Sequence, residues 1–191
     1  MATFSEFTDS YSEIKQILRI HSRILFSLTT FFRIQNNMKI ALLEENILTY
    51  LVQEHHHGLT LCQNIHQGFR KNIEPERIKK YCIWFFKQNI EIHFKIEEQY
   101  IFPILGKDHI LVKKALREHR KIKRLIEDRT DIIKSINLLE ELIEAHIRFE
   151  EKNIFNDIQK KVTQEIKNAI LNDTDFHTTK ITSEWHDAFW Q

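Results

Sequence analysis

The chain has 191 residues, which is enough for one domain with a substantial core and too few for two domains of ordinary size. Its three glycines and two prolines are too few for the many tight turns of a β-sandwich or an α/β fold, so a few long helices are favoured. With 28 basic and 27 acidic side chains the formal net charge is +1, and we expect no electrostatic binding to nucleic acid or to anionic membranes.

The predicted elements begin with an N-terminal extension over residues 1–37. This extension is rich in Ser, Thr and Phe, and its pattern from Tyr11 to Arg33 allows an amphipathic helix. We expect the functional domain over residues 38–161, followed by a weak helix and a polar tail over residues 162–191.

Apolar side chains recur at helical spacing along four segments of that domain. The four predicted helices run over residues 42–70, 76–105, 109–128 and 135–161. Short links between long helices make sequential neighbours antiparallel. The sequence therefore predicts an all-α, up-down-up-down four-helix bundle.

The compartment is predicted from cysteine usage and from the longest apolar stretch. Cys62 and Cys82 form no paired metal motif and suit packed thiols in a reducing compartment. The apolar stretch over residues 24–34 is interrupted by polar side chains, so we expect neither a membrane span nor a signal peptide. We therefore predict a cytoplasmic protein.

The second and fourth predicted helices repeat one another. Residues 91–102 and 144–155 align with a shared leading Glu, a His, an acidic pair and a final Ile-Phe. In both copies a His and a Glu stand four positions apart, which places them on one face of a helix.

The first and third predicted helices also match, although more weakly. Glu54-His55 aligns with Glu118-His119, and apolar residues follow at the same distances in both. The sequence therefore predicts two helical hairpins, each with one lone His and one His-x-x-x-Glu. A pseudo-two-fold axis through the core would relate the two hairpins.

These polar groups fall on or beside the apolar stripes and converge in the predicted core. A single His on an apolar face is usually a satisfied core histidine, and a single His-x-x-x-Glu is usually a surface pair. Six such groups in one small domain are different, because each unpartnered buried polar group costs roughly 1–3 kcal/mol. A metal centre satisfies all of them at once, and the predicted ligands are His55, His93, Glu97, His119, His146 and Glu150.

The donor set indicates which metal is expected. Four imidazoles and two carboxylates suit redox-active iron better than Mg²⁺ or Ca²⁺, which prefer oxygen. The ferritin-type site repeats Glu-x-x-His, and that spacing occurs here only at Glu54-x-x-His57. A ferritin-type site is therefore disfavoured.

The first predicted helix carries three consecutive histidines, so its ligand has alternatives. His55 has the best register, because it follows Glu54 as His119 follows Glu118. His56 is the alternative, and His57 is expected at the periphery.

These motifs resemble the hemerythrin-like family, also called the HHE cation-binding domain, in its bacterial four-His subgroup. The resemblance covers about residues 48–159, and the segments that carry it are Glu54-His55, His93-Phe-Lys-Ile-Glu97-Glu98-x-x-Ile-Phe-Pro103, Glu118-His119 and His146-Ile-Arg-Phe-Glu150-Glu151-x-x-Ile-Phe155. It implies two non-haem iron ions, oxo- or hydroxo- and carboxylate-bridged. The four histidines would be terminal ligands, and Glu97 and Glu150 would be the bridges.

One departure from the family separates this chain from its oxygen carriers. Those members have a His-x-x-x-His on the third helix, whereas the position four after His119 is Lys123 here. The chain thus resembles iron-sensing and stress-repair members more closely.

The leading hypothesis is a protein that binds, senses or reduces a small oxidant (O₂, peroxide or NO), or responds to iron or redox state. An iron storage or delivery module without turnover, or a structural metal-binding bundle, is the alternative. The sequence indicates no partner protein and leaves open whether the protein is an enzyme.

Overall fold

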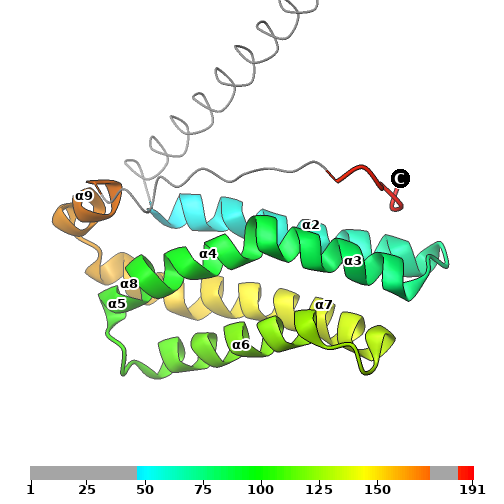
Figure 1. The fold of residues 1–191 in the computed structure, drawn as a ribbon. Helices are drawn as coiled ribbons and strands as arrows, with labels where there is room; N and C mark the ends of the chain where they lie inside the picture. The colour runs from blue at the N-terminus through cyan, green and yellow to red at the C-terminus, as the bar shows by residue number, and fades with distance from the viewer. Residues whose placement is uncertain (1–46, 173–184) are drawn as a thin grey trace, which may run out of the picture. The chain divides into compact units, whose positions relative to one another are not determined.

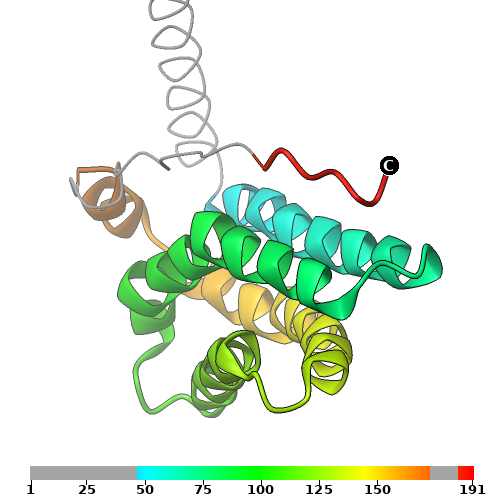
Figure 2. The ribbon, with the colours of Figure 1, turned by 45° about the vertical axis from the view of Figure 1, so that its right-hand side comes forward.

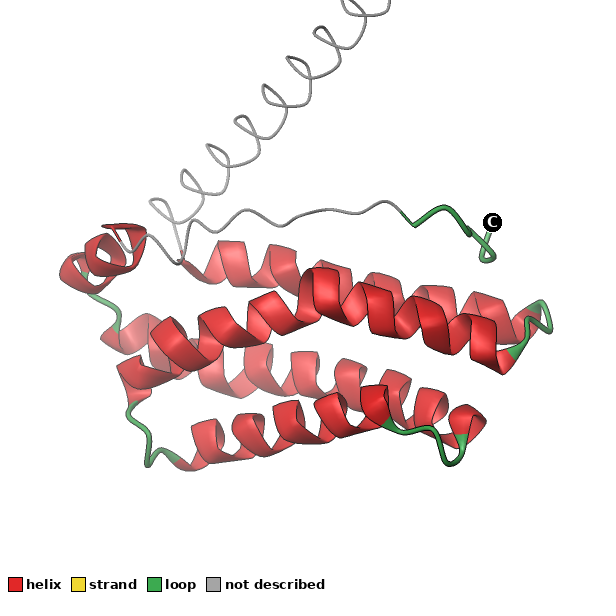
Figure 3. Cartoon of the chain, in the orientation of Figure 1, coloured by secondary structure: helices red, strands yellow, loops and turns green. Residues whose placement is uncertain are grey.

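The structure is a computed structural model that describes residues 47–172 and 185–191. All regular secondary structure in this part of the chain is helical (Figure 3). The elements, in chain order, are α2 Ile47–Arg70, α3 Pro75–Phe85, η1 Phe86–Ile90, α4 Glu91–Ile96, η2 Glu97–Ile101, α5 Phe102–Leu105, α6 Ile110–Glu127, α7 Ile132–Phe149, η3 Glu150–Ile154, α8 Phe155–Lys161 and α9 Gln164–Asn172. The expected helix within the N-terminal extension lies outside the described residues.

Four long helical rods lie side by side as an antiparallel bundle (Figures 1 and 2). The second rod is continuous from α3 to α5 and contains the π-helical turns η1 and η2, and the fourth joins α7, η3 and α8. Helix α7 packs against both α2 and α6. The predicted all-α, up-down-up-down bundle is confirmed.

The link between the first two rods follows from local sequence. Asn72 adopts a left-handed conformation with φ 54°, and the backbone N–H groups of Asn72 and Ile73 donate to the carbonyls of Phe69 and Gly68. This is the Schellman pattern that ends many helices. Pro75 then opens α3, where its missing N–H removes nothing from the helix.

Helix α7 begins three residues before the predicted start at residue 135. The carboxylate of Asp131 accepts a hydrogen bond from the backbone N–H of Lys134 at 3.0 Å. This N-cap satisfies one of the free N–H groups of the first turn, so the helix extends back to Ile132.

The apolar core of the bundle is divided into two clusters. On α2, Leu51 belongs to one cluster and Leu61 to the other. On α6, Ala115 and Ile122 are divided in the same way. The positions between them form a polar layer that crosses the middle of the bundle.

The C-terminal residues 185–191 contact α3. The rings of Trp185 and Trp190 lie 5.4 and 4.6 Å from the ring of Tyr81, and Arg77 forms an ion pair with Asp187. Among the helices of the described part of the chain, none is long and apolar enough to cross a membrane.

Candidate metal centre

The six predicted ligands come together in the polar layer. They come from all four rods: His55 from α2, His93 from α4, Glu97 from the start of η2, His119 from α6, His146 from α7 and Glu150 from the start of η3. Each is at most 5% exposed. The two carboxylates occupy equivalent positions of the internal repeat, and each begins a π-helical turn, a feature that often marks functional sites.

The six side chains form two overlapping groups of metal-ligand type. One group comprises His55, His93, Glu97 and Glu150, and the other comprises Glu97, His119, His146 and Glu150. Within each group, the ligand atoms lie within 4.8 Å of one another. Both groups contain the same two carboxylates, so the arrangement has two adjacent positions for a cation.

Glu97 faces both histidine pairs. Its Oε1 lies 3.3 Å from Nε2 of His93 and 3.9 Å from Nε2 of His55. Its Oε2 lies 3.3 Å from Nε2 of His119. One oxygen is therefore directed to each side of the site.

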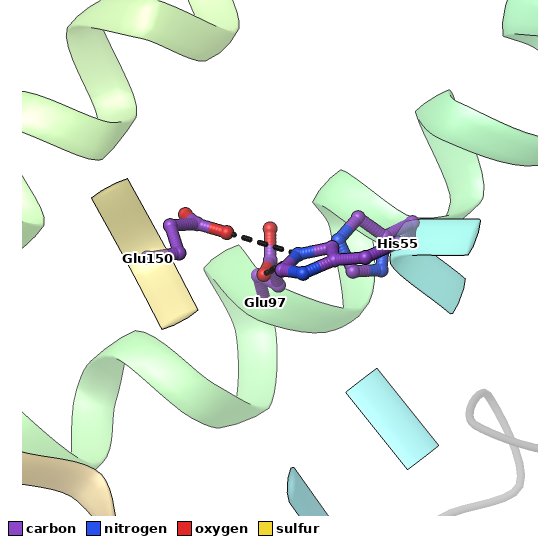
Figure 4. A group of neighbouring side chains, drawn as sticks. His55, Glu97 and Glu150 are labelled. Atoms are coloured by element: carbon purple, nitrogen blue, oxygen red, sulfur yellow. Dashed lines mark ion pairs between the residues drawn. The ribbon is translucent and has the colours of Figure 1, made fainter. Parts of the chain in front are cut away.

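Glu150, on the opposite rod, also directs one oxygen to each histidine pair. Its Oε2 lies 3.3 Å from Nε2 of His55, and Figure 4 shows this ring pointing toward both carboxylates. Its Oε1 lies 3.4 Å from Nε2 of His146 and 3.9 Å from Nε2 of His119. The predicted pseudo-two-fold relation thus holds at the level of individual oxygen atoms.

Three of the four imidazoles are oriented through Nδ1 by a further carboxylate. The contacts are His119 to Glu98 at 2.8 Å, His55 to Glu151 at 2.9 Å and His146 to Glu118 at 3.0 Å. A carboxylate only accepts, so Nδ1 donates in each contact and Nε2 is the nitrogen that faces the cluster. This is the usual way in which proteins set the tautomer of a metal-ligating histidine.

The polar atoms at the centre fit a bound cation. Both oxygens of Glu97 and of Glu150, and Nε2 of His55 and of His93, are buried without a hydrogen-bond partner among the described residues. Each such atom costs roughly 1–3 kcal/mol if nothing compensates its lost hydration. A cation held by these atoms removes that cost.

Comparison with known proteins agrees with this geometry. The sequence model of the hemerythrin HHE cation binding domain matches residues 46–158. The chain belongs to this family. Neither the comparison with curated proteins nor the comparison with solved structures finds a match to this chain.

In this hemerythrin domain the histidine triplet of α2 presents one ring to the cluster. His55 is 2% exposed, whereas His56 and His57 lie on the exposed surface. Lys123, which stands where oxygen-carrying members have a further histidine, is half-buried on α6.

Burial and charge act in opposite directions on the pKa values of the cluster. Burial alone would raise the pKa of Glu97, but the imidazoles of His93, His119 and His55 outweigh it and hold that pKa well below the usual range. Burial and the nearby Glu97 together raise the pKa of Glu150. In the absence of a cation, the two carboxylates therefore repel one another and depend on protonated imidazoles for compensation.

A cavity of about 20 Å³ adjoins the site. Three of the predicted ligand rings, those of His55, His93 and His146, border it, and the remainder of its wall is mainly apolar and includes Phe94 and Ile122. A cavity of about 10–15 Å³ holds one water-sized molecule. This space thus matches a single small molecule beside the imidazoles.

Sequence reasoning missed the role of Glu118. It served only to align Glu118-His119 with Glu54-His55, and nothing indicated that its carboxylate would contact His146 on the next rod. The acidic residue beside each lone histidine was the available signal. That signal is ambiguous, because the carboxylate of the equivalent Glu54 lies beside the phenol of Tyr50.

Proposed function

We propose that this hemerythrin domain is a non-haem di-iron protein that binds, senses or reduces a small oxidant such as O₂, peroxide or NO. The proposal rests on the orientation of the two central carboxylates. Glu97 and Glu150 each direct one oxygen to the His55–His93 pair and the other oxygen to the His119–His146 pair. Two ions at these positions would share both carboxylates and take two imidazoles each. Four nitrogen ligands and two carboxylates suit iron better than Mg²⁺ or Ca²⁺.

The protein's own groups have separate tasks in this proposal. The four histidines hold the ions through Nε2, and the carboxylates on Nδ1 keep three of the rings in the correct tautomer. When bound, the pair of iron ions supplies one-electron chemistry toward the oxidant. The mainly apolar cavity beside His55, His93 and His146 has space for one small molecule.

Lys123 indicates whether the protein would react with O₂ or carry it reversibly. With no histidine at this position, each pair offers two imidazoles, and positions on the ions remain for water or a small molecule. We therefore propose a protein that reacts with an oxidant and does not carry O₂ reversibly. The reduced protein should be oxidised to the ferric state on mixing with O₂ and should stay ferric after degassing. A spectrum that disappears on degassing and returns with O₂ would make it an oxygen carrier.

The identity of the metal is tested on protein purified from iron-replete cells. Elemental analysis should find about two iron ions per chain, and the visible spectrum should respond to O₂ or NO. A single ion, or zinc alone, would refute the di-iron proposal. Two iron ions that leave readily to a chelator and respond to neither gas would instead indicate iron storage.

A further inference from the structure

The two halves of the site differ at one imidazole. His146 has Glu118 on its Nδ1 at 3.0 Å, whereas Nδ1 of His93, the equivalent residue of the repeat, is buried without a hydrogen-bond partner among the described residues. The equivalent of Glu118 in the first half is Glu54. Its carboxylate lies beside the phenol of Tyr50, whose pKa is raised first by burial and then by Glu54.

The aromatic packing of the lone histidines also differs between the two halves of the site, and the second half has more of it. The ring of His119 is stacked by Phe94 at 3.6 Å and by Phe102 at 5.6 Å between centroids. The ring of His55 is stacked by Phe155 at 5.3 Å. Since Phe155 is the repeat equivalent of Phe102, Phe94 is an additional ring stacked on the imidazole of His119 in the second half.

The cavity adds a third difference. Gly58 on α2 and Ile122 on α6 both border it. These two positions are equivalent, because Gly58 follows His55 at the same distance as Ile122 follows His119. Both histidines of the first pair, His55 and His93, border the cavity, whereas His146 alone does so from the second pair. The first pair therefore has a free space beside it, and His119 is enclosed by aromatic rings.

From these differences we propose that the two cation positions are unequal. The His119–His146 position holds its ion tightly, and the His55–His93 position holds an exchangeable ion. This inference rests on the proposed di-iron function. An acceptor on the far nitrogen of a ligand histidine typically changes metal affinity by roughly 10–100-fold, and both rings of the tight pair have one, whereas His93 has none. In this proposal Glu118 is a positioning residue that acts through His146.

The test measures release of iron(II) from the full chain. The protein is loaded anaerobically with two equivalents of iron(II), a strong ferrous chelator is added in excess, and the coloured complex is followed with time. We expect two phases of equal amplitude, one ion each, whose rates differ by about tenfold or more. A single phase containing both ions would overturn the proposal and leave the di-iron function intact, whereas failure to bind two ions would refute the di-iron function itself.

Variants assign the phases to positions. In Glu118→Gln the slow phase should accelerate by roughly tenfold or more, so that it approaches or merges with the fast phase, whose own rate is unchanged. Glu98→Gln, which replaces the carboxylate acceptor of His119 with a weaker, neutral amide acceptor, should do the same. Glu151→Gln replaces the carboxylate acceptor of His55 with a neutral amide acceptor and should accelerate the fast phase instead. Glu144→Gln is the matched control, because Glu144 is on α7 with its carboxylate on Arg148 at 3.1 Å.

An unchanged fast phase distinguishes positioning from general destabilisation, which would accelerate both phases. The assignment is overturned if Glu118→Gln changes the fast phase alone, or if neither Glu118→Gln nor Glu98→Gln alters the slow phase. Because Glu98 is partly exposed, its substitution keeps the proposal testable if Glu118→Gln does not fold.

Discussion

Gly58 offers a direct test of the cavity beside the imidazoles. A Cβ atom at this position would lie 2.8 Å from Cδ1 of Ile147 and 3.3 Å from Cγ2 of Ile143. Both isoleucines border the cavity, and Cδ1 of Ile147, the closer atom, is the end of its side chain and can shift into that space. Gly58→Ala therefore fills the space either with the new methyl group or with a displaced isoleucine.

Two opposing contributions determine the stability of Gly58→Ala. Replacing a mid-helix glycine with alanine contributes about 0.5–1 kcal/mol in favour of folding. Overpacking typically costs about 1–3 kcal/mol, and the lower part of that range applies because the neighbours can move into free volume. We expect a net loss of about 1 kcal/mol, equivalent to a decrease in melting temperature of roughly 3 °C.

The effect on ligand access should be much larger than the effect on stability. A cavity of about 20 Å³ leaves little room once a methyl group enters it. We expect the iron content of Gly58→Ala to equal that of the unaltered protein. We expect its reaction with NO or O₂, followed by stopped-flow absorption of the anaerobically reduced protein, to slow by at least about tenfold, or about 1.4 kcal/mol in the barrier.

Gly68→Ala is the matched control on the same helix. Its Cβ would lie 2.8 Å from the ring of Phe189 and 2.9 Å from Cδ1 of Ile78, and neither residue borders the cavity. It should lose stability without any change in reaction rate. If fully iron-loaded Gly58→Ala reacts at the original rate, the oxidant does not use this cavity and the reasoning is wrong.

Three further predictions concern the ligands, pH and the N-terminal extension. His93→Ala and His146→Ala should each lose iron and melt at a lower temperature, because each leaves the rest of a buried polar cluster uncompensated. The control is His57→Ala, at an exposed position, which should do neither. Elemental analysis and thermal unfolding of the three variants test this prediction. Burial disfavours protonation of His119, but Glu97 and Glu98 outweigh it and raise its pKa from 6.5 to about 9 in the metal-free protein. The folded metal-free chain thus binds this proton more tightly than the unfolded chain, and the resulting stabilisation is complete below about pH 6.5 and lost as the pH rises through about 9. The melting temperature of metal-free protein should therefore fall over this range, and a flat profile would contradict the assignment. Finally, a chain that begins at Met38 should fold and bind iron with nearly the same melting temperature, whereas insolubility would show that residues 1–37 cover part of the bundle.

Much of the fold follows from local rules that act on neighbouring residues. The scarcity of glycine and proline, the helical spacing of apolar residues and the short links were sufficient to predict the bundle. Pro75, whose missing N–H removes nothing from a first helical turn, opens the second rod. The N-cap at Asp131 was overlooked, because capping depends on one side-chain contact that the apolar pattern of α7 does not contain.

The candidate ligands were also readable, because four-residue spacing on a helix places His93 with Glu97 and His146 with Glu150 whatever surrounds them. The register of the repeat favoured His55 of the triplet and left His56 as the alternative, and the tertiary structure buries His55. The rotation of α2 about its axis is set by packing of its apolar side chains against the other rods, and that rotation turns His56 to the surface.

One difference between the two halves of the site, the pairing of carboxylates with imidazoles, depended on tertiary contacts. The repeat suggested equivalent halves, yet Glu118 reaches His146 while Glu54 lies beside Tyr50. Which carboxylate meets which imidazole depends on the separation and rotation of adjacent rods to within about an ångström, because a hydrogen bond weakens steeply with distance and angle. Spacing along one chain determines what shares a helical face, but contacts across rods are decided only when the whole core packs.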